Sequence, residues 1–182
     1  GSSWDPQPIL RLETDRNGWP SLLSFGSGKE AVITHTGSSL KMTERTIIGS
    51  GLWTEQNLLP SLVWNRSATG GLDGNAIHMI ALTTPSSLGG SLFNGMDGAV
   101  LYFRSQDGGT TWDIINMQLP EMDIAYFLGF EADNYSIAAQ GETVVVAYFN
   151  DWGDSFIVKS TDNGDTWTKT IFLDFPVDNY II

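Results

Sequence analysis

The chain has 182 residues, no cysteine and a formal net charge of −12. This length is enough for one domain with a hydrophobic core, and the lack of cysteine excludes disulfide bonds and thiol chemistry. The acidic balance argues against nucleic acid and anionic membranes as partners. No run of about 18 apolar residues is present, so we expect no membrane-spanning helix. The 20 glycines and 12% aromatic residues are typical of an all-β protein.

Residues 1–19 are expected to form an extended N-terminal segment. Two prolines in Asp5-Pro6-Gln7-Pro8 disfavour a helix there. The following stretch, Ile9-Leu10-Arg11-Leu12, is more apolar, and we predict one short strand over residues 9–13.

The remainder, residues 20–182, contains a unit that occurs three times, at about 20–59, 60–120 and 121–175. The predicted first strands are Pro20-Ser21-Leu22-Leu23, Pro60-Ser61-Leu62-Val63 and Tyr135-Ser136-Ile137-Ala138. The predicted second strands are residues 31–35, 76–82 and 144–149, and the third strands are residues 40–43, 99–104 and 155–160. Residues 144–149 are apolar without alternation, which predicts a strand buried on both faces. The middle unit is longer, and its extra residues fall in Gly/Ser/Asn/Asp-rich loops at 69–75 and 84–97.

An eight-residue pattern, S-x-D-x-G-x-T-W, follows two of the third strands. Its defined positions are Ser105, Asp107, Gly109, Thr111 and Trp112, and then Ser160, Asp162, Gly164, Thr166 and Trp167. In each copy the Asp is expected to cap backbone N–H groups of a tight turn, and the Gly to take a positive φ. The Trp would cover the resulting hairpin. A degraded copy ends at Trp53.

This pattern resembles the Asp-box, or BNR repeat, of sialidase-like β-propellers. The resemblance covers about residues 20–182 and implies an all-β propeller of four-stranded blades, with about three blades present and the ring incomplete. In that family the box is a structural turn between the third and fourth strands, away from the active site. The strand at residues 9–13 would then be a ring-closing strand.

The end of the chain looks like the start of another blade. Asn179-Tyr180-Ile181-Ile182 is similar to Asn134-Tyr135-Ser136-Ile137, which opens the third unit. Three blades leave apolar faces and unpaired strand edges. We therefore expect the remainder of the same propeller, or a partner chain, to cover the open edge.

Sialidases, as a family, use an arginine cluster to bind a carboxylate, and the first arginine lies in an R-I-P-like motif. The matching stretch here is Asn17-Gly18-Trp19-Pro20, with Gly18 in place of the arginine and Arg16 out of register. The whole chain has nine Lys and Arg residues. This departure favours a non-catalytic role over sialidase activity.

Six loop carboxylates are candidates for glycoside hydrolysis or are simply solvated acids: Asp73, Asp97, Glu121, Asp123, Glu131 and Asp133. Asp73 and Asp97 lie in the insertions of the middle unit and are the preferred ligand-binding candidates. Trp64 and Trp152, like Trp19, lie near predicted strand ends, where their rings would stack on sugars or pack between blades.

No metal or other cofactor is expected. Residues 151–154 and 162–165 are rich in oxygen ligands and leave Ca²⁺ as an alternative, but neither has the spacing of an EF-hand loop. His35 and His78 lie on predicted strands without a second ligand at metal spacing, and we interpret them as packed strand histidines.

Two functions from different classes remain. The first is a non-catalytic secreted or cell-surface propeller that acts as a scaffold or binding module for glycan or protein, either alone or as part of a larger surface or secretion assembly. The alternative is a sialidase-like glycoside hydrolase whose catalytic residues lie mostly in the missing half. The composition resembles that of extracellular surface proteins of Bacteroidetes-type bacteria, which use the type IX secretion route.

Overall fold

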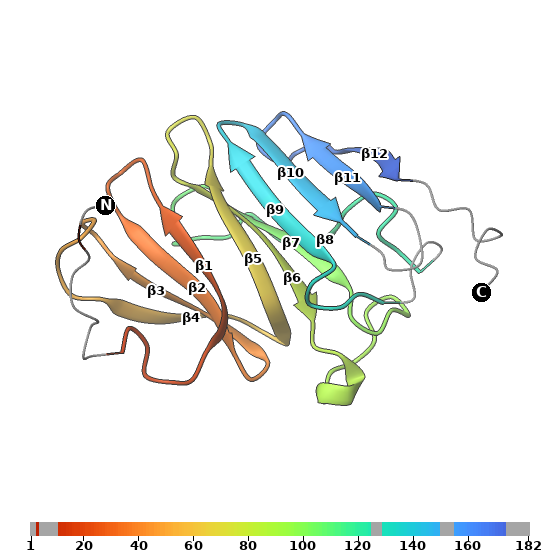
Figure 1. Cartoon of the computed structure of the whole chain (residues 1–182), viewed down its shortest axis with the longest axis horizontal. Coiled ribbons are helices and arrows are strands. Elements are labelled where there is room, and N and C mark those ends of the chain that lie inside the picture. The colour runs from red at the N-terminus through yellow and green to blue at the C-terminus, as the bar shows by residue number, and fades with distance from the viewer. Residues whose placement is uncertain (1–2, 4–10, 125–128, 150–154, 174–182) are drawn as a thin grey trace.

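The computed structural model describes residues 3, 11–124, 129–149 and 155–173. These residues form 12 strands in three four-stranded antiparallel sheets, with a short 3₁₀ turn at Ser86–Leu88 (Figure 1). The predicted all-β class and the four-stranded units are therefore confirmed. Within the described residues, no helix is long and apolar enough to cross a membrane.

Each sheet is built from consecutive strands of the chain. The first sheet contains β1 (Gly18–Ser24), β2 (Glu30–Thr36), β3 (Ser39–Arg45) and β4 (Thr54–Pro60). The second contains β5 (Leu62–Gly70), β6 (Ala76–Thr83), β7 (Val100–Ser105) and β8 (Ile114–Gln118). The third contains β9 (Tyr135–Gln140), β10 (Thr143–Tyr148), β11 (Ser155–Ser160) and β12 (Thr168–Leu173).

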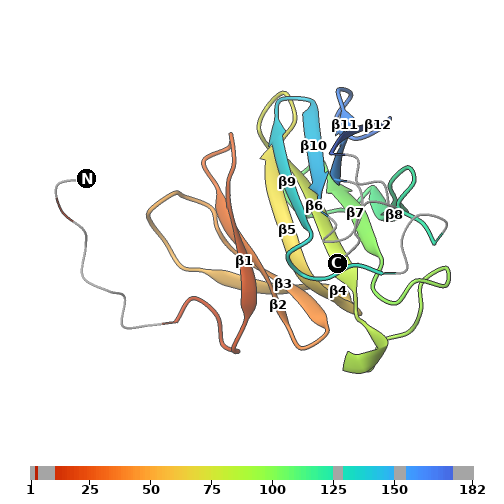
Figure 2. The same ribbon diagram turned by 45° about the vertical axis from the view of Figure 1, so that its right-hand side comes forward.

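The three sheets pack face to face as successive blades. Strand β5 contacts both β1 and β9, so the first strand of every sheet lies along one common side (Figures 1 and 2). These three strands run in the same direction and begin at the same end of the molecule. This arrangement is an arc of a propeller, with β1, β5 and β9 as inner strands.

The middle sheet is covered on both faces. All eight residues of β6 are buried, because the first sheet covers one face and the third sheet covers the other. Strand β10 differs: Val144, Val146 and Tyr148 are buried, whereas Val145 and Ala147 are only partly buried. The prediction that residues 144–149 are buried on both faces was wrong, since no described residue covers the second face of this strand. Its expected last residue, Phe149, follows the strand and is 48% exposed.

The predicted alignment of the inner strands is corrected in the second sheet. Ser21 pairs with Ile33, and the equivalent partner in β5 is Arg66, which pairs with Ile80. Pro60 is the last residue of β4. The similarity between Pro20-Ser21-Leu22 and the Pro-Ser-Leu that begins at Pro60 was misleading. The structural equivalent of Pro20 is Asn65, which lies five residues after Pro60.

Both S-x-D-x-G-x-T-W turns form the expected hydrogen bonds. In the first, Ser105 Oγ accepts from Gly109 N at 2.8 Å, and Asp107 Oδ1 accepts from Thr111 N at 2.8 Å. The hydroxyl of Thr111 donates to Asp107 Oδ2 at 2.6 Å. The second turn repeats this network from Ser160 to Trp167. Each turn joins the third strand of its sheet to the fourth, at the end opposite to the start of the inner strands.

The glycine of each turn packs against the preceding sheet. Gly109 has a φ of 94°, and a Cβ atom there would lie 2.6 Å from Met42 Cε on β3. Gly164 has a φ of 90°, and a Cβ atom there would lie 2.1 Å from the Tyr102 hydroxyl on β7. Only glycine fits this position, because both the backbone conformation and the neighbouring side chain exclude a Cβ. The turns therefore hold neighbouring blades together.

A buried polar pair lies behind the second turn. His78 Nδ1 and the Tyr102 hydroxyl are 2.7 Å apart, and both side chains are fully buried. Burial, aided by the nearby Arg104 cation, lowers the pKa of His78 to about 4, so the imidazole is neutral at physiological pH. This geometry is that of a packed strand histidine.

The N-terminal segment covers the outer face of the first sheet with polar contacts. Glu13 Oε1 accepts from Thr34 Oγ1 at 2.8 Å, and Asp15 pairs with the buried Lys41. Residues 11–13 form no strand, while residues 9 and 10 lie outside the described part, as does the expected fourth-blade start at 179–182. The ring-closing strand therefore remains a prediction.

Candidate functional site

The best candidate site lies at the end of the molecule where the inner strands begin. A cavity of about 350 Å³ opens there between the loops that follow β6 and β8. Its wall is formed by Trp64, Pro85, Ser87, Asp97, Phe130, Glu131, Ala132 and Asp133. We call this cavity, together with the adjacent Trp19 ring, the mouth.

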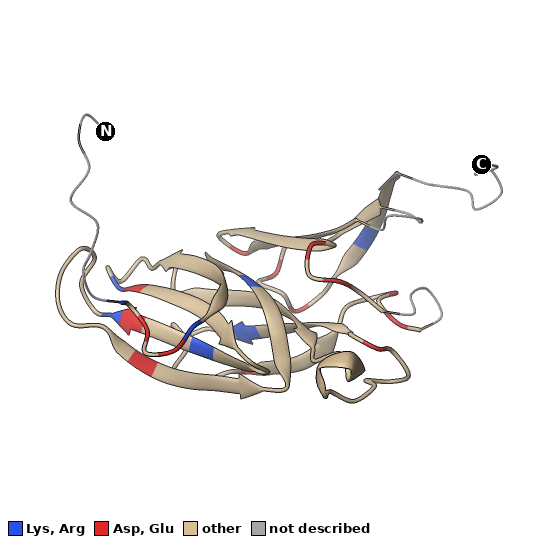
Figure 3. Cartoon of the chain, turned by 60° about the horizontal axis from the view of Figure 1, so that its bottom comes forward, with Lys and Arg blue, Asp and Glu red and all other residues tan. Residues whose placement is uncertain are grey.

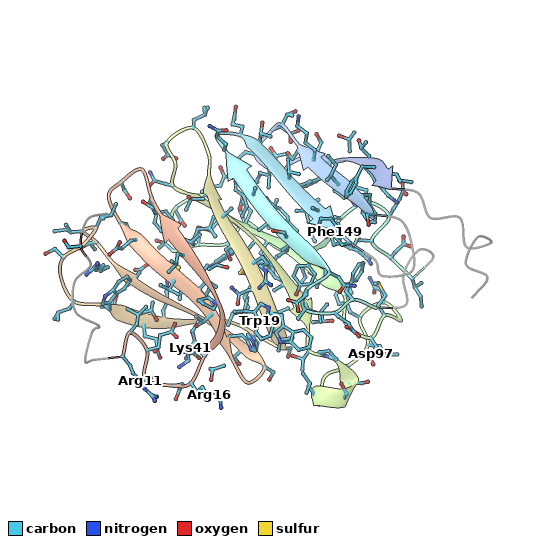
Figure 4. The ribbon with its side chains drawn as sticks, viewed as in Figure 1. Arg11, Arg16, Trp19, Lys41, Asp97 and Phe149 are labelled. Atoms are coloured by element: carbon cyan, nitrogen blue, oxygen red, sulfur yellow. The ribbon has the colours of Figure 1, made fainter. Side chains whose placement is uncertain are left out.

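Two tryptophans occupy equivalent β-bulges at the mouth. Trp19 and Pro20 stand opposite a single residue of β2, and Trp64 and Asn65 stand opposite a single residue of β6. Trp19 has a φ of 51° and Trp64 a φ of 49°, a conformation that a bulky residue rarely adopts. The bulges bring the two rings together, with centroids 6.0 Å apart and planes tilted by 50°. Both side chains are partly exposed, and Figure 4 shows Trp19 at the same end of the sheets as Asp97.

Hydrogen bonds from neighbouring strands hold the two bulges in place. The Tyr135 hydroxyl of β9 donates to the carbonyl of Trp64 at 2.6 Å. Asn65 Nδ2 donates to the Ile33 carbonyl at 3.0 Å, and Ser21 Oγ accepts from Ser67 N at 3.0 Å. Strained backbone persists only where its surroundings fix it. Contacts from all three sheets therefore define the geometry of the mouth.

Three carboxylates line the cavity in different environments. Asp97 accepts from Ser86 Oγ at 2.6 Å and from Ser86 N at 2.7 Å, and these hydrogen bonds lower its pKa. Asp133 lies 3.5 Å from Arg66. Glu131 and Asp133 are both exposed. The ionised Asp97 is unsuited to act as a general acid, which requires a raised pKa.

The two loops that carry these acids are joined to each other. Phe130 N donates to the Gly98 carbonyl at 3.0 Å, and a Cβ atom at Gly129 would lie 2.3 Å from the Asp97 carbonyl oxygen. This close approach requires glycine at residue 129. The cavity wall is therefore a joined pair of loops.

The structure separates the two preferred acidic candidates. Asp73 lies in the turn after β5, at the opposite end from Asp97, and lines a different cavity of about 260 Å³. It accepts from the side chain of Asn75 at 2.9 Å and from Asn75 N at 3.0 Å, and these bonds lower its pKa. Asp73 thus has the geometry of a turn cap. Trp152 lies outside the described residues.

Position 18 has little space for an arginine. A Cβ atom at Gly18 would lie 3.2 Å from His35 Nε2, and the His35 ring packs against Trp19 with centroids 5.8 Å apart. A long side chain at Gly18 would therefore require the ring to move. Within the described part of the chain, no group of three or more His, Asp or Glu side chains could hold a metal ion.

Comparison with known proteins identifies the fold. The chain matches Trypanosoma rangeli sialidase in complex with sialic acid, with a TM-score of 0.54 and 15% identity over 84% of this chain and 30% of the sialidase. The same enzyme in complex with the inhibitor DANA gives a TM-score of 0.55 at 14% identity, with the same coverage. This chain has the sialidase-like β-propeller fold. The predicted propeller fold and its resemblance to the propeller of sialidases are thereby confirmed.

A second sialidase gives the same result. NanB from Streptococcus pneumoniae matches with a TM-score of 0.50 and 15% identity, over 86% of this chain and 23% of that protein. No family model and no curated protein matches the sequence. This sialidase-like propeller arc spans about 30% of the length of the first sialidases that it matches, and at these identities the likeness concerns the fold alone.

Sequence reasoning found part of the mouth and missed part. Trp64 and Asp97 were candidates and do line one cavity, together with Glu131 and Asp133. The pairing of Trp64 with Trp19 was missed, although each tryptophan lies two residues before an equivalent position of its inner strand, Ser21 or Arg66. That common spacing was the available signal, and the incorrect alignment on Pro60 hid it.

Proposed function

We propose that this chain is a non-catalytic glycan-binding module of a secreted or cell-surface protein, and that the mouth is its binding site. The observation that carries the proposal is the pair of partly exposed tryptophan rings at the rim of an acidic cavity. Each ring lies on a bulge whose strained φ costs about 1–3 kcal/mol. Such strain is typical of binding sites, where it holds a side chain in a functional position. Tryptophan offers an apolar face with a polar N–H, which suits a ring of C–H and O–H groups.

The charge of the mouth defines the class of glycan. No Lys or Arg occurs in residues 67–103 or 105–158, which include both loops of the cavity wall, and Figure 3 shows acidic segments on these loops. The nearby cation, Arg66, already faces Asp133. A sugar carboxylate would meet uncompensated negative charge, so the expected ligand is a neutral or amino-substituted oligosaccharide.

The test is a mutation of one ring of the pair. Trp64→Ala is expected to weaken binding of a neutral oligosaccharide about 30-fold, equivalent to about 2 kcal/mol, because half of the aromatic surface is removed. A glycan array first selects the oligosaccharide, and isothermal titration calorimetry then measures its affinity. Trp53→Ala is the matched control, since Trp53 is also partly exposed but packs on Arg45 in the turn between β3 and β4. Equal affinity of the unmodified chain, Trp64→Ala and Trp53→Ala for the oligosaccharide would contradict the proposal. A preference of the unmodified chain for sialylated glycans would also contradict it.

The hydrolase alternative is favoured by one observation, the three carboxylates around a single cavity. Among the described residues, the Glu131 carboxylate is the one of these three that forms no side-chain hydrogen bond or ion pair, so it is the strongest candidate for a catalytic role. In that case hydrolysis of aryl glycosides would fall about 100-fold or more in Glu131→Gln, while the Asp73→Asn control would be unaffected. We expect no turnover above the buffer rate in the unmodified chain, and turnover abolished by Glu131→Gln would establish the alternative.

The longer protein is part of the proposal as well. No described residue of the sialidase-like arc covers the second face of the third sheet, and we infer that the remainder of a propeller covers it. Residence outside the cell and membership of a larger surface assembly are part of the same proposal: the proposed glycan site supports the first, and the uncovered face supports the second.

A further inference from the structure

The contact between neighbouring blades is repeated within this chain. At the first interface, the Gly109 turn packs on Met42 of β3. At the second, the Gly164 turn packs on Tyr102 of β7. Met42 and Tyr102 occupy equivalent places, since Met42 pairs with Ile33 and Tyr102 pairs with Ile80 in the neighbouring strands. The turn of each blade therefore packs against one defined position on the third strand of the blade before it.

A cation accompanies this contact at both interfaces. Lys29 Nζ donates to the carbonyl of Gly108 at 2.7 Å, and Arg104 Nη1 donates to the carbonyl of Asn163 at 2.7 Å. Gly108 and Asn163 are equivalent, because each directly precedes the turn glycine. The carbonyl of that residue thus receives a charged hydrogen bond from the preceding blade. Lys29 also pairs with Glu44, the β3 residue two positions after Met42.

The third sheet carries the same two positions as the second sheet, and no turn among the described residues packs on them. Counting back from the serines of the two turns, Ile157 corresponds to Tyr102 and Lys159 to Arg104. Ile157 is partly exposed and Lys159 is exposed. Within the described residues, no ion pair is formed by the Lys159 ammonium group, whereas Arg104 pairs with both Asp113 and Asp165. The third blade therefore presents an apolar position and a cation in the arrangement that the second blade uses to bind a turn.

The surface around these two residues is apolar. It is formed by Val145, Ala147, Phe149, Ile157, Lys159 and Phe172, which we call the open face. Strand pairing places Ala147 beside Ile157 and Val145 beside Lys159. Phe149 and Phe172 are 48% and 53% exposed, with ring centroids 5.9 Å apart, and Figure 4 shows Phe149 at the end of β10. The equivalent residues of the second sheet, Ile80, Tyr102 and Arg104, are buried.

We propose that the open face binds a further blade whose own S-x-D-x-G-x-T-W turn places its glycine on Ile157 and its preceding carbonyl on Lys159. The two existing interfaces argue for this occupant, because in each the turn glycine packs on the equivalent residue of the third strand and the preceding carbonyl accepts a hydrogen bond from a cation of the blade before it. That cation is Arg104 of β7 at the second interface and Lys29, which pairs with Glu44 of β3, at the first. A second copy of this chain fits less well. Its complete turns are already engaged, and the outer face of its first sheet is covered by Glu13 and Asp15.

The test uses cysteine accessibility, because the chain has no cysteine of its own. The reporter is Thr170→Cys, since Thr170 is exposed and pairs with Ile157. Ser38→Cys, in the exposed turn between β2 and β3, is the control. Maleimide labelling is measured in the 182-residue chain and in a chain in which a second copy of residues 119–173 follows residue 173. The extension is expected to slow labelling of Thr170→Cys about tenfold and to leave Ser38→Cys unchanged.

Two further variants complete the test. Lys159→Glu in the extended chain should restore most of the labelling rate, because the turn carbonyl then faces an anion. Ile157→Tyr with Lys159→Arg copies the acceptor pair of the second blade and should increase the protection. The proposal is overturned if Thr170→Cys is protected neither in the extended chain nor in the extended chain with Ile157→Tyr and Lys159→Arg. It is also overturned if the 182-residue chain is itself protected and sediments as a dimer, since a second copy then occupies the open face.

Discussion

Gly164→Ala is expected to lower the melting temperature by about 10 °C, or about 3 kcal/mol. Two costs combine in this variant. Alanine disfavours the φ of 90° at this turn, and its Cβ would lie 2.1 Å from the hydroxyl of Tyr102. Because Tyr102 is fully buried and bonded to His78, the ring has no free space into which to move. Thermal unfolding followed by circular dichroism measures the change.

Gly141→Ala is the matched control for this prediction. Gly141 lies in the same sheet with a φ of 54°, but a Cβ atom there would meet no atom within 4 Å. It therefore carries the backbone cost alone, about 1 kcal/mol. Tyr102→Phe should recover part of the Gly164→Ala loss by removing the hydroxyl. Equal losses at residues 164 and 141 would show that the turn does not hold the blades together.

The free energy of unfolding is expected to fall by up to about 3 kcal/mol between pH 7 and pH 4, through His78 alone. Burial lowers the pKa of the folded His78 to about 4, below its ordinary value of 6.5. Between these values the unfolded chain binds a proton that the folded chain does not bind, so stability is complete above pH 6.5 and declines as the pH falls. Urea unfolding at pH 7.0, 5.5 and 4.5 measures this slope.

His78→Gln separates this effect from other acid effects. Glutamine retains a polar group beside Tyr102 but does not titrate, so the slope between pH 6.5 and 4.5 should largely disappear. The carboxylates with a lowered pKa, such as Asp97 and Asp162, act at lower pH because their unfolded values are already near 4. An unchanged slope in His78→Gln would show that His78 is charged in the folded protein.

The strands and turns were predictable because their determinants are local. The S-x-D-x-G-x-T-W pattern carries its own hydrogen-bonding partners within eight residues, as Asp107 and Thr111 illustrate. A turn of this kind fixes the strands that lead into it, so β7 and β11 were predicted close to their true positions. A continuous apolar run such as residues 76–82 indicates a strand that is buried on both faces, and this could be predicted from the run itself.

The mouth was less predictable because its determinants are not local. The bulges at Trp19 and Trp64 depend on strand register, which a single missing residue shifts. Asp73 and Asp97 seemed comparable as loop acids of one unit, but one follows β5 and the other follows β6, so they lie at opposite ends. In β10, buried residues alternate with partly buried ones because only one face of the third sheet is covered by described residues. The apolar composition of this strand does not indicate which of its faces is covered.

Fluorine NMR of the chain labelled with 5-fluorotryptophan would test the glycan-binding proposal most directly. The seven tryptophans give separate resonances that are assigned by single substitution to phenylalanine. Titration with the neutral oligosaccharide selected on the array should shift the Trp19 and Trp64 resonances, while Trp112 and Trp167, which lie in the turns at the opposite end, stay unchanged. Shifts confined to the turn tryptophans, or no shift at saturating ligand, would contradict a glycan site at the mouth.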